Sequence, residues 1–401
     1  MANDMKTISI LGATGSIGRS SLDVISSLGD SFNIFGLSCH KNIVLLYEQI
    51  IQFNPVYAII TDQASYEAFI RQHGEEVNST KILFGHEGMD IISSNENVST
   101  VIAAITGFPC IYSVLSAIKH NKTILIANKE ILVSAGNMII SQLKNSKATI
   151  LPIDSEHNAL LQIILSSGLE YKINDAHYYK NKIKNLVITA SGGPFIDYNF
   201  KDLQKVIAKD AIKHPTWNMG KKISVDSSTM MNKGLEIIEA KILFNLNIEN
   251  ITAIIHRQSK IHAFVEFFDG TVISHMSNPD MKIPISYAIT YPERKFISDG
   301  NFFSYDNLTF EEVTQDKFPC YRLAREVAHI GKNSGLILNA ANEISVEYFL
   351  EDRIAYLDIP NIIEDILESS EIINHDSFDS IIENDKEIRE LTKDRIKTKY
   401  L

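Results

Sequence analysis

Three acidic residues have the types and the spacing of a divalent-metal site. Asp154 and Glu156 directly follow the apolar run 148–153 (ATILPI), and Glu236 lies further along the chain. Side chains two residues apart on an extended backbone point to the same side, and two carboxylates on one side repel unless a proton or a cation lies between them. Oxygen ligands without a neighbouring cysteine favour Mg²⁺ or Mn²⁺ over zinc. The alternative interpretation is a helix start, because Asp154 or Ser155 would make a good N-cap.

A second candidate site lies in segment 214–240 (HPTWNMGKKISVDSSTMMNKGLEIIEA), where polar groups stand among apolar ones. The run 226–229 (DSST) predicts the start of a helix that continues to about Phe244. The free N–H groups of a first helical turn, together with the Ser227 hydroxyl, would bind an anion such as phosphate. We therefore expect a phosphate-binding site around Ser227.

The same predicted helix carries polar residues on one face. Asn232 and Glu236 are four residues apart and share this face, with Lys233 beside it. The pattern favours a ligand site in which Glu236 is the third carboxylate for the metal. The alternative is a capped amphipathic helix with a surface Lys–Glu pair, which would leave Asn232 and the upstream Trp217 to Gly220 unexplained.

Glycine spacing near the start of the chain indicates a nucleotide site. The apolar run 6–11 (KTISIL) leads into GATGSIG, and helical periodicity follows from Arg19. The spacing of Gly12, Gly15 and Gly18 lets the backbone approach a pyrophosphate at a helix N-terminus. Glycine-rich turns also occur where a strand and a helix merely pack closely, so this pattern alone leaves both interpretations open.

The end of the second predicted strand, 33–38 (NIFGLS), refines the expected nucleotide. It is followed by Cys39, His40, Lys41 and Asn42, and none of these is acidic. An NAD site usually has an acidic residue here to bind the ribose 2′-hydroxyl, whereas a 2′-phosphate needs neutral or positive donors. The sequence therefore favours NADP(H) over NAD(H), although a lysine after a strand is commonly a solvated surface residue.

Strand and helix patterns alternate through the first part of the chain, which predicts a doubly wound parallel sheet. The strand expected at 123–127 (TILIA) ends in Asn128, Lys129 and Glu130, at the edge of the sheet where ligands bind. We expect a ligand role for Lys129. Asn128 would equally serve as a helix N-cap.

The rest of the chain predicts two further regions. The loop 191–195 (SGGPF) has glycines that free backbone N–H groups for an anion, and 191–220 has the composition of a lid. The pair Asp269-Gly270 signals a hairpin, and helical patterns fill the C-terminal part. We therefore expect an α/β protein with a Rossmann-like parallel-sheet domain, a central α+β domain and a C-terminal helical domain. The expected bounds are 1–153, 154–289 with a flexible loop at about 191–220, a linker at 290–313, and 314–401.

Composition and charge exclude several classes of function. Of the 401 residues, 45% are apolar and 22% are charged, as in ordinary globular proteins, and the net charge of −11 argues against broad contact with nucleic acid or anionic lipid. The three cysteines are far apart and fit no disulfide or zinc pattern, which indicates a reducing compartment. The first apolar run is too short for a signal peptide or a membrane span. These features predict a cytoplasmic protein that acts on a small molecule.

Seven motifs make the chain similar to the 1-deoxy-D-xylulose 5-phosphate reductoisomerase family. They are LGATGSIG from Leu11, ANKEI from Ala127, PIDSEHNAL from Pro152, SGGPF from Ser191, HPTWNMGKKISVDSSTMMNKGLE from His214, IHRQSKIHAFVEF from Ile255 and ANEISV from Ala341. The motifs occur in all three expected regions, and the block from His214 is the most specific. The resemblance implies an enzyme of non-mevalonate isoprenoid biosynthesis that depends on NADPH and on Mg²⁺ or Mn²⁺, with Co²⁺ as a further metal that the site could take.

The resemblance also assigns roles to individual residues. NADPH contacts would be Thr14, Gly15, Ser16, Ile17, Lys41, Asn42, Asn128, Glu130 and Gly220. Metal ligands would be Asp154, Glu156 and Glu236. Substrate contacts would be Lys129, Ser155, Glu156, Ser191, His214, Trp217, Ser227, Asn232, Lys233 and Glu236, and the catalytic group would be Lys129, Asp154, Glu156, His214 and Glu236. One departure stands out, because the family usually has glycine where this chain has His40.

The implied reaction has two stages. A metal-assisted rearrangement of the carbon skeleton of 1-deoxy-D-xylulose 5-phosphate precedes reduction by NADPH to 2-C-methyl-D-erythritol 4-phosphate. The implied partners are this sugar phosphate and a second copy of the chain in a homodimer, without nucleic acid or membrane.

Two other classes of function remain open. A short-chain-type dehydrogenase would need a Tyr-x-x-x-Lys pair on a helix. Tyr178 with Lys182 lies in a polar stretch without helical periodicity, and Tyr291 with Lys295 spans a proline. An NADP-sensing regulatory protein would not need the three carboxylates.

Overall fold

The computed structural model describes residues 5–29, 31–175, 177–213, 220–295 and 307–401. The chain divides into two compact units, each built from several segments. Unit 1 comprises Met1–Ile131, Ile139–Asn158 and Asp280–Phe302, and unit 2 comprises Leu132–Met138, Ala159–Pro279 and Phe303–Leu401. The division passes through α6 (Lys129–Lys144) and α7 (Ser155–Ser166), so each of these helices belongs partly to both units.

Unit 1 is organised around an eight-stranded sheet with the order β4-β5-β3-β2-β1-β6-β7-β8. All neighbouring strands are parallel except β4, which is antiparallel to β5 at one edge. Strand order reverses between β1 and β6, which is where doubly wound sheets bind ligands. The strands are β1 (Lys6–Leu11), β2 (Phe32–Cys39), β3 (Tyr57–Ile60), β4 (Glu76–Val77), β5 (Thr80–Phe84), β6 (Thr100–Ala103), β7 (Thr123–Ile126) and β8 (Thr149–Pro152).

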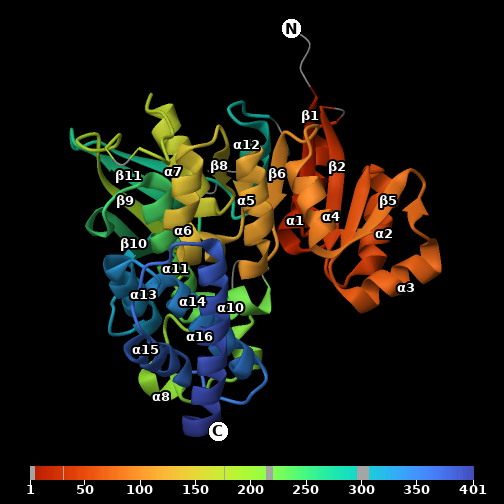
Figure 1. Cartoon of the computed structure of the whole chain (residues 1–401). Helices are drawn as coiled ribbons and strands as arrows, with labels where there is room; N and C mark the ends of the chain where they lie inside the picture. Colours follow the sequence, from red (N-terminus) through yellow and green to blue (C-terminus); the bar gives the residue numbers. More distant parts are fainter. Residues whose placement is uncertain (1–4, 30, 176, 214–219, 296–306) are drawn as a thin grey trace. The chain divides into compact units, whose positions relative to one another are not determined.

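Helices connect the parallel strands of unit 1, and β1, β2 and β5 are visible beside α2 and α3 in Figure 1. All four residues of β6 and the last four of β1 are buried, which explains why these strands read as continuous apolar runs. The helices are α1 (Ser16–Ser27), α2 (Ile43–Phe53), α3 (Gln63–His73), α4 (Gly85–Ser94), α5 (Ile111–Lys119), both ends of α6, the first part of α7, and α12 (Lys282–Thr290), with a 3-10 turn at Phe108–Cys110.

Helix α12 joins unit 1 from a distant part of the sequence. It packs against α1, and Lys282 Nζ lies 2.8 Å from the Asp23 carboxylate. Lys6 Nζ, at the start of β1, donates to the carbonyl oxygens of Ile289 (3.3 Å) and Tyr291 (3.1 Å). Unit 1 is therefore completed by a segment that follows most of the central sheet in the chain.

Unit 2 contains a mixed five-stranded sheet with the order β12-β11-β9-β10-β13. Strands β9 and β10 are parallel, and β11 and β12 form the hairpin that Asp269-Gly270 predicts. Gly270 has a φ of +85°, a conformation that glycine adopts without steric cost. The strands are β9 (Ile183–Ala190), β10 (Ile251–Ile255), β11 (Ile261–Phe267), β12 (Val272–Met276) and β13 (Glu311–Glu312).

The C-terminal part of unit 2 is helical. Figure 1 shows α13 to α16 gathered together in blue, and α14 packs against α13, α15 and α16. The helices are α13 (Pro319–Ile330), α14 (Ser334–Leu350), α15 (Asp358–Ser369) and α16 (Phe378–Lys399). Helix α14 is buried nearly all round, as the central helix of such a group must be.

The other helices that lie wholly in unit 2 come between β9 and β10 along the chain. They are α8 (Phe200–Leu203), α9 (Ala208–Ala211), α10 (Lys221–Ser228) and α11 (Met231–Phe244), with a 3-10 turn at Ile248–Asn250. The segment 200–211 forms the two short helices α8 and α9. Asn199 and Asp202 form a capping box at the first, and the buried Val206 lies between them.

The expected fold class is confirmed. The structure has a parallel Rossmann-like sheet, a mixed central sheet and a helical C-terminal region. The expected domain bounds remain a prediction.

Candidate active site

The GATGSIG turn joins β1 to α1 and is shaped by close backbone contacts. Gly12 has a φ of +85°, and a Cβ atom there would lie 2.9 Å from the Ala104 carbonyl oxygen. A Cβ atom on Gly18 would lie 2.3 Å from the Gly12 carbonyl oxygen, so only glycine allows α1 to approach the turn this closely. The Gly12 N–H donates to Ser38 Oγ (2.9 Å) on β2. The expected nucleotide contacts on this turn are at least partly exposed: Thr14, Gly15, Ser16 and Ile17.

The end of β2 carries three exposed polar residues, His40, Lys41 and Asn42. Asn42 is the N-cap of α2, because its Oδ1 accepts from the Leu45 N–H (3.2 Å). His40 Nδ1 lies 3.0 Å from Thr61 Oγ1, which follows β3. No carboxylate occupies residues 39–42, so the donors present suit a 2′-phosphate.

Asn128 caps α6 at the end of β7. Its Oδ1 accepts from the Ile131 N–H (3.2 Å), and its Nδ2 donates to the carbonyl oxygens of Ile105 (2.5 Å) and Gly107 (2.6 Å). The expected capping role is therefore confirmed, and the same amide ties the ends of β6 and β7 together. Glu130, in the first turn of α6, is 6% exposed.

Lys129 and Asp154 form an ion pair within unit 1. Lys129 Nζ lies 2.5 Å from Asp154 Oδ2, and both side chains are mostly buried. Asp154 Oδ1 also accepts from the Ser155 N–H (3.0 Å) at the start of α7. An ammonium group so close to a carboxylate neutralises its charge in a part of the protein with little water.

The expected strand geometry of Asp154 and Glu156 is wrong. Strand β8 ends at Pro152, and Glu156 is the second residue of α7. Ser155 Oγ donates to Glu156 Oε2 (2.6 Å). The helix start that we weighed as the alternative is therefore present, and a helical turn sets the position of Glu156 relative to Asp154.

The prediction of one continuous helix over 226–244 is also wrong, because the helical conformation is interrupted between α10 and α11. Met230 adopts a φ of +60°, and the Met231 N–H is bonded to Thr229 Oγ1 (3.3 Å). Ser227 therefore lies in the last turn of α10 rather than at a helix N-terminus. The first-turn N–H groups that we expected to bind phosphate at Ser227 do not exist there. A substrate role for the Ser227 hydroxyl, which is half-buried, stays a prediction.

Asn232, Lys233 and Glu236 share one face of α11, as the sequence predicts. The Glu236 carboxylate accepts hydrogen bonds from Asn232 Nδ2 and from Lys233 Nζ. Glu236 is 1% exposed and Lys233 is 3% exposed. The surface Lys–Glu pair that we weighed as the alternative is excluded by this burial.

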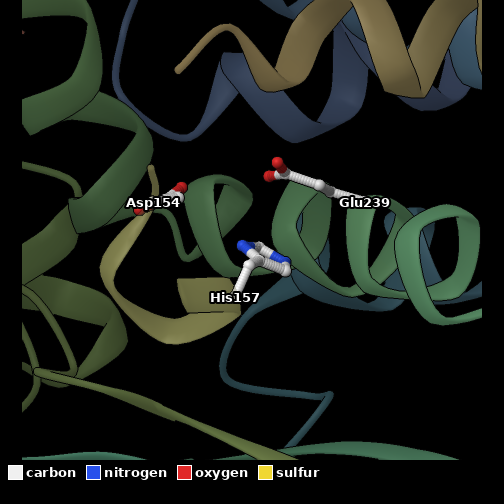
Figure 2. A group of neighbouring side chains, drawn as sticks. All are labelled: Asp154, His157 and Glu239. Atoms are coloured by element: carbon white, nitrogen blue, oxygen red, sulfur yellow. The ribbon is translucent and has the colours of Figure 1, made fainter. Parts of the chain in front are cut away.

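The carboxylates lie close enough to share one cation. Single ligand atoms of Asp154, Glu156 and Glu236 all lie within 4.8 Å of one another. A second group contains Asp154, His157 and Glu239, also within 4.8 Å, and Figure 2 shows these three side chains.

Both groups contain Asp154, so they are two alternative sets of ligands for a metal ion bound to this carboxylate. The all-oxygen group suits Mg²⁺ or Mn²⁺, whereas a histidine would favour a softer metal. Sequence analysis did not single out His157 and Glu239. Helical spacing could have identified both residues, because His157 is three residues from Asp154 and Glu239 is three from Glu236.

The SGGPF loop follows β9. Gly192 and Gly193 have φ values of +85° and +70°, and a Cβ atom on Gly193 would lie 2.6 Å from the Ser227 carbonyl oxygen. Ser191 Oγ accepts from the Gly193 N–H (3.3 Å). These contacts bring the half-buried Ser191 and Ser227 into the same part of unit 2, as a shared substrate site requires.

His214 and Trp217, which the resemblance assigns to the substrate, lie outside the described residues. Gly220 is the N-cap of α10 and is exposed. A Cβ atom there would meet no atom of the described residues within 4 Å, so their packing does not require glycine at this position.

Asp226 is a buried carboxylate that sequence analysis treated only as a cap. Lys222 Nζ lies 2.9 Å from Asp226 Oδ2, and Asn342 Nδ2 donates to Asp226 Oδ1 (2.9 Å). Asp226 is 1% exposed, and Asn342 on α14 is fully buried. The ANEISV motif thus holds α10 against the C-terminal helices, next to Ser227. The sequence offered one signal for this contact, the ANEISV motif, to which no role was assigned. Asp226 and Asn342 are too far apart in sequence for a local pattern to connect them.

His262 on β11 is a further buried group of unit 2. Burial lowers its pKa to about 4, and the nearby charge of Lys233 acts in the same direction. The neutral ring is hydrogen-bonded through Nε2 to the Ser277 carbonyl oxygen (3.3 Å). His262 is therefore uncharged at neutral pH.

Cys39, Cys110 and Cys320 are free and buried, and burial raises the pKa of each thiol to about 12. The expectation that they form no disulfide is confirmed. Among the described residues, no helix combines the length and the apolar character that crossing a bilayer requires.

Three family models match the chain. The model described as 1-deoxy-D-xylulose 5-phosphate reductoisomerase matches residues 8–136. Its C-terminal domain matches residues 150–244, and the DXP reductoisomerase C-terminal domain matches residues 276–391.

Two relatives that bear the name 1-deoxy-D-xylulose 5-phosphate reductoisomerase match nearly the whole chain. The protein of Caldanaerobacter subterraneus subsp. tengcongensis is 41% identical over 400 residues, with 99% of this chain and 100% of the relative covered. The protein of Clostridium perfringens is 40% identical over 388 residues, with 96% and 98% covered.

Solved structures are similar over the same length. A crystal structure of DOX-P reductoisomerase in complex with NADPH, fosmidomycin and magnesium has a TM-score of 0.91 and 38% identity, with 98% of both chains covered. The Zymomonas mobilis enzyme in complex with NADPH has a TM-score of 0.86 and 33% identity, with 98% of this chain and 99% of the other covered.

Proposed function

The chain belongs to the 1-deoxy-D-xylulose 5-phosphate reductoisomerase family, and from this premise we propose that it converts 1-deoxy-D-xylulose 5-phosphate to 2-C-methyl-D-erythritol 4-phosphate. The observation that carries the proposal is the group of three carboxylates, Asp154, Glu156 and Glu236, within 4.8 Å. A reductase that only transfers hydride to a carbonyl does not need such a group. A rearrangement assisted by a divalent cation does.

The residues present fit both bound groups of the family. Carboxylate oxygens are the ligands that Mg²⁺ and Mn²⁺ prefer. The glycine turn leaves room for a pyrophosphate at the start of α1, and the end of β2 offers a lysine and a histidine to a 2′-phosphate. When bound, the cation would supply a Lewis acid at the substrate carbonyl and an adjacent hydroxyl, and NADPH would supply the hydride.

The charged residues near the carboxylates would orient the substrate. We assign Asp154, Glu156 and Glu236 to the metal, and Lys129 to the reacting end of the substrate. Lys129 is already held beside Asp154 at 2.5 Å, so its ammonium group is positioned before the substrate arrives. A positioned charge of this kind stabilises developing negative charge without a cost of reorganisation.

The phosphate group would be bound in unit 2. We assign this role to Ser191, Ser227, Asn232 and Lys233, with Ser155 as a further substrate contact. The Gly193 contact with the last turn of α10 supports a shared site for the two serines. Binding energy from a non-reacting phosphate can be used to orient the reacting carbons. We retain His214 and Trp217 as proposed substrate contacts.

NADPH would lie along the carboxyl edge of the sheet in unit 1. We assign its contacts to Thr14, Gly15, Ser16, Ile17, Lys41, Asn42, Asn128, Glu130 and Gly220. The support for this assignment is the uncapped start of α1 at Gly15 and the absence of an acid at the end of β2.

We further propose a cytoplasmic homodimer with the four sequence regions given above. Free, buried cysteines support a reducing compartment. Sedimentation of the purified chain would test the dimer, and a monomer at working concentration would contradict it.

An assay of NADPH oxidation with 1-deoxy-D-xylulose 5-phosphate tests the function. We expect turnover with Mg²⁺ or Mn²⁺, loss of turnover in EDTA, and recovery when the metal is restored. Full turnover without metal would favour a plain dehydrogenase. NADPH binding without turnover under any metal condition would favour an NADP-sensing protein.

A further inference from the structure

The ring of His40 has a defined position at the end of β2. Its Nδ1 lies 3.0 Å from Thr61 Oγ1, just after the neighbouring strand β3. The Thr61 hydroxyl donates to the Cys39 carbonyl oxygen (3.4 Å), and the Thr61 N–H donates to the same oxygen (3.1 Å). A lone pair of Thr61 Oγ1 is therefore left to accept from a protonated Nδ1. The threonine thus fixes an exposed ring that would otherwise rotate.

Two charged residues face this ring. Lys41 follows it on the same segment, and Asp62 follows Thr61 at the start of α3. Asp62 accepts from the Ser65 N–H (3.0 Å) and the Ser65 hydroxyl (2.7 Å), so its carboxylate is used as the cap of α3. These hydrogen bonds lower the pKa of Asp62, and the charges of Lys41 and His40 lower it further. Asp62 is therefore held as the cap of α3 through its Oδ2.

We infer that His40 is a specificity-determining residue for the nucleotide, and that its imidazolium form donates from Nε2 to the 2′-phosphate of NADPH. The inference rests on the proposed function, because it assumes that NADPH binds along this sheet edge. When both ring nitrogens are protonated, Nδ1 donates to Thr61 and Nε2 is free to donate to an anion. With Lys41 alone, the preference for NADPH would change near neutral pH only as far as the phosphate itself titrates.

The inference predicts a preference that depends on pH. Histidine gains its proton as pH falls through the range around 6 to 7, so affinity for NADPH relative to NADH should rise in that direction. The second proton of the phosphate itself binds near pH 6 and should act equally in every variant.

Dissociation constants of NADPH and NADH, measured by fluorescence between about pH 6 and pH 8, test this inference. For the wild type, we expect the ratio of NADH to NADPH dissociation constants to fall about threefold to fivefold as pH rises, which is the size expected for an exposed charge pair. His40→Ala should lower the ratio at pH 6 by a similar factor. The pH dependence that remains in this variant should come only from titration of the phosphate. His40→Lys should keep a high ratio across the range, and Thr61→Val should weaken the effect of the histidine.

His120→Ala is the matched control. His120 is an exposed histidine of unit 1 at the end of α5, with Nδ1 bonded to the Ser116 carbonyl oxygen (2.9 Å), at the opposite edge of the sheet. Its removal should leave the ratio unchanged at every pH. An unchanged ratio in His40→Ala would overturn the inference while leaving the proposed function intact. Failure of the wild type to bind NADPH would overturn the proposed function as well.

Discussion

The two ligand regions of the molecule are shaped by different parts of the chain. In the GATGSIG turn of unit 1, the backbone sets the geometry, because Gly12 and Gly18 leave no room for a Cβ atom. Around α10 and α11 of unit 2, ionic side chains set it, and the buried Glu236 is bonded to Lys233 and Asn232. We therefore expect the first region to recognise its ligand by fit to the main chain. We expect the second to recognise its ligand by charge.

This difference determines how each region should respond to mutation. Added volume should damage the turn, since a packed backbone cannot move to accommodate it. Changed charge should damage the α10–α11 region, since a buried charge that loses its partner is costly.

The largest effect is expected from Glu236→Gln. Loss of one of three carboxylates should reduce turnover about a thousandfold, the scale of losing a group that stabilises the transition state, while NADPH affinity changes less than about threefold. Steady-state rates and nucleotide titration measure both.

The neighbouring Glu239→Gln is the control for this change. Glu239 lies on the same helix and is also 1% exposed. It should retain turnover within about tenfold if the all-oxygen group binds the metal. A larger loss in Glu239→Gln than in Glu236→Gln would instead assign the metal to the group that contains His157.

Gly18→Ala tests the turn in unit 1. The added Cβ atom would lie 2.3 Å from the Gly12 carbonyl oxygen, so we expect a loss of about 3 kcal/mol in the free energy of unfolding. Gly15→Ala places its Cβ atom 3.3 Å from the same oxygen and should cost less. Urea denaturation measures both, and equal losses would show that backbone packing does not shape this turn.

His262→Gln tests the electrostatics of unit 2. The folded pKa of about 4 lies below the usual 6.5, so between these values the unfolded chain binds more protons and stability falls as pH falls. At pH 5 this histidine should account for about 2 kcal/mol of that loss. Unfolding free energies at pH 7 and pH 5 should therefore differ less in the variant. An unchanged difference would mean that the ring is protonated in the folded state.

The smallest effect is expected from Asn342→Leu, which removes one hydrogen bond to Asp226. The last turn of α10 should be held less firmly, and the KM for the sugar phosphate should rise about fivefold, which corresponds to about 1 kcal/mol, the net strength of one typical hydrogen bond. The KM for NADPH should stay constant. Asn339→Leu is the control, because Asn339 is equally buried on α14 and bonds to Glu343 (3.4 Å) instead. A raised substrate KM in both variants would indicate a general loss of packing.

The backbone-shaped region could be predicted from sequence more fully than the charge-shaped one. Glycine spacing and strand periodicity are local signals, so the turn, the parallel sheet and the Asn128 cap were all predictable. The break at Met230 was not, because a methionine with a φ of +60° has no local signal and DSST resembles a helix start. That break moved Ser227 from the start of one helix to the end of another.

Contacts between residues far apart in the sequence also could not be predicted, because they leave no local pattern. Asn342 is 116 residues from Asp226, and no local pattern connects them. The pairing of Lys233 with Glu236 was visible as a spacing, but its burial was not. Burial depends on the helices that cover α11, and α13 is made long after it in the chain.

The late arrival of α12 has a consequence for how this protein is made. Helix α1 needs α12 as a packing partner, yet about 250 residues of chain are synthesised between them, which takes many seconds on the ribosome. During that time the apolar face of α1 remains uncovered by its final partner, while β9 to β12 are already available to fold. The order of synthesis and the order of completion are therefore reversed: the nucleotide-binding half begins first and finishes only after the central sheet has emerged.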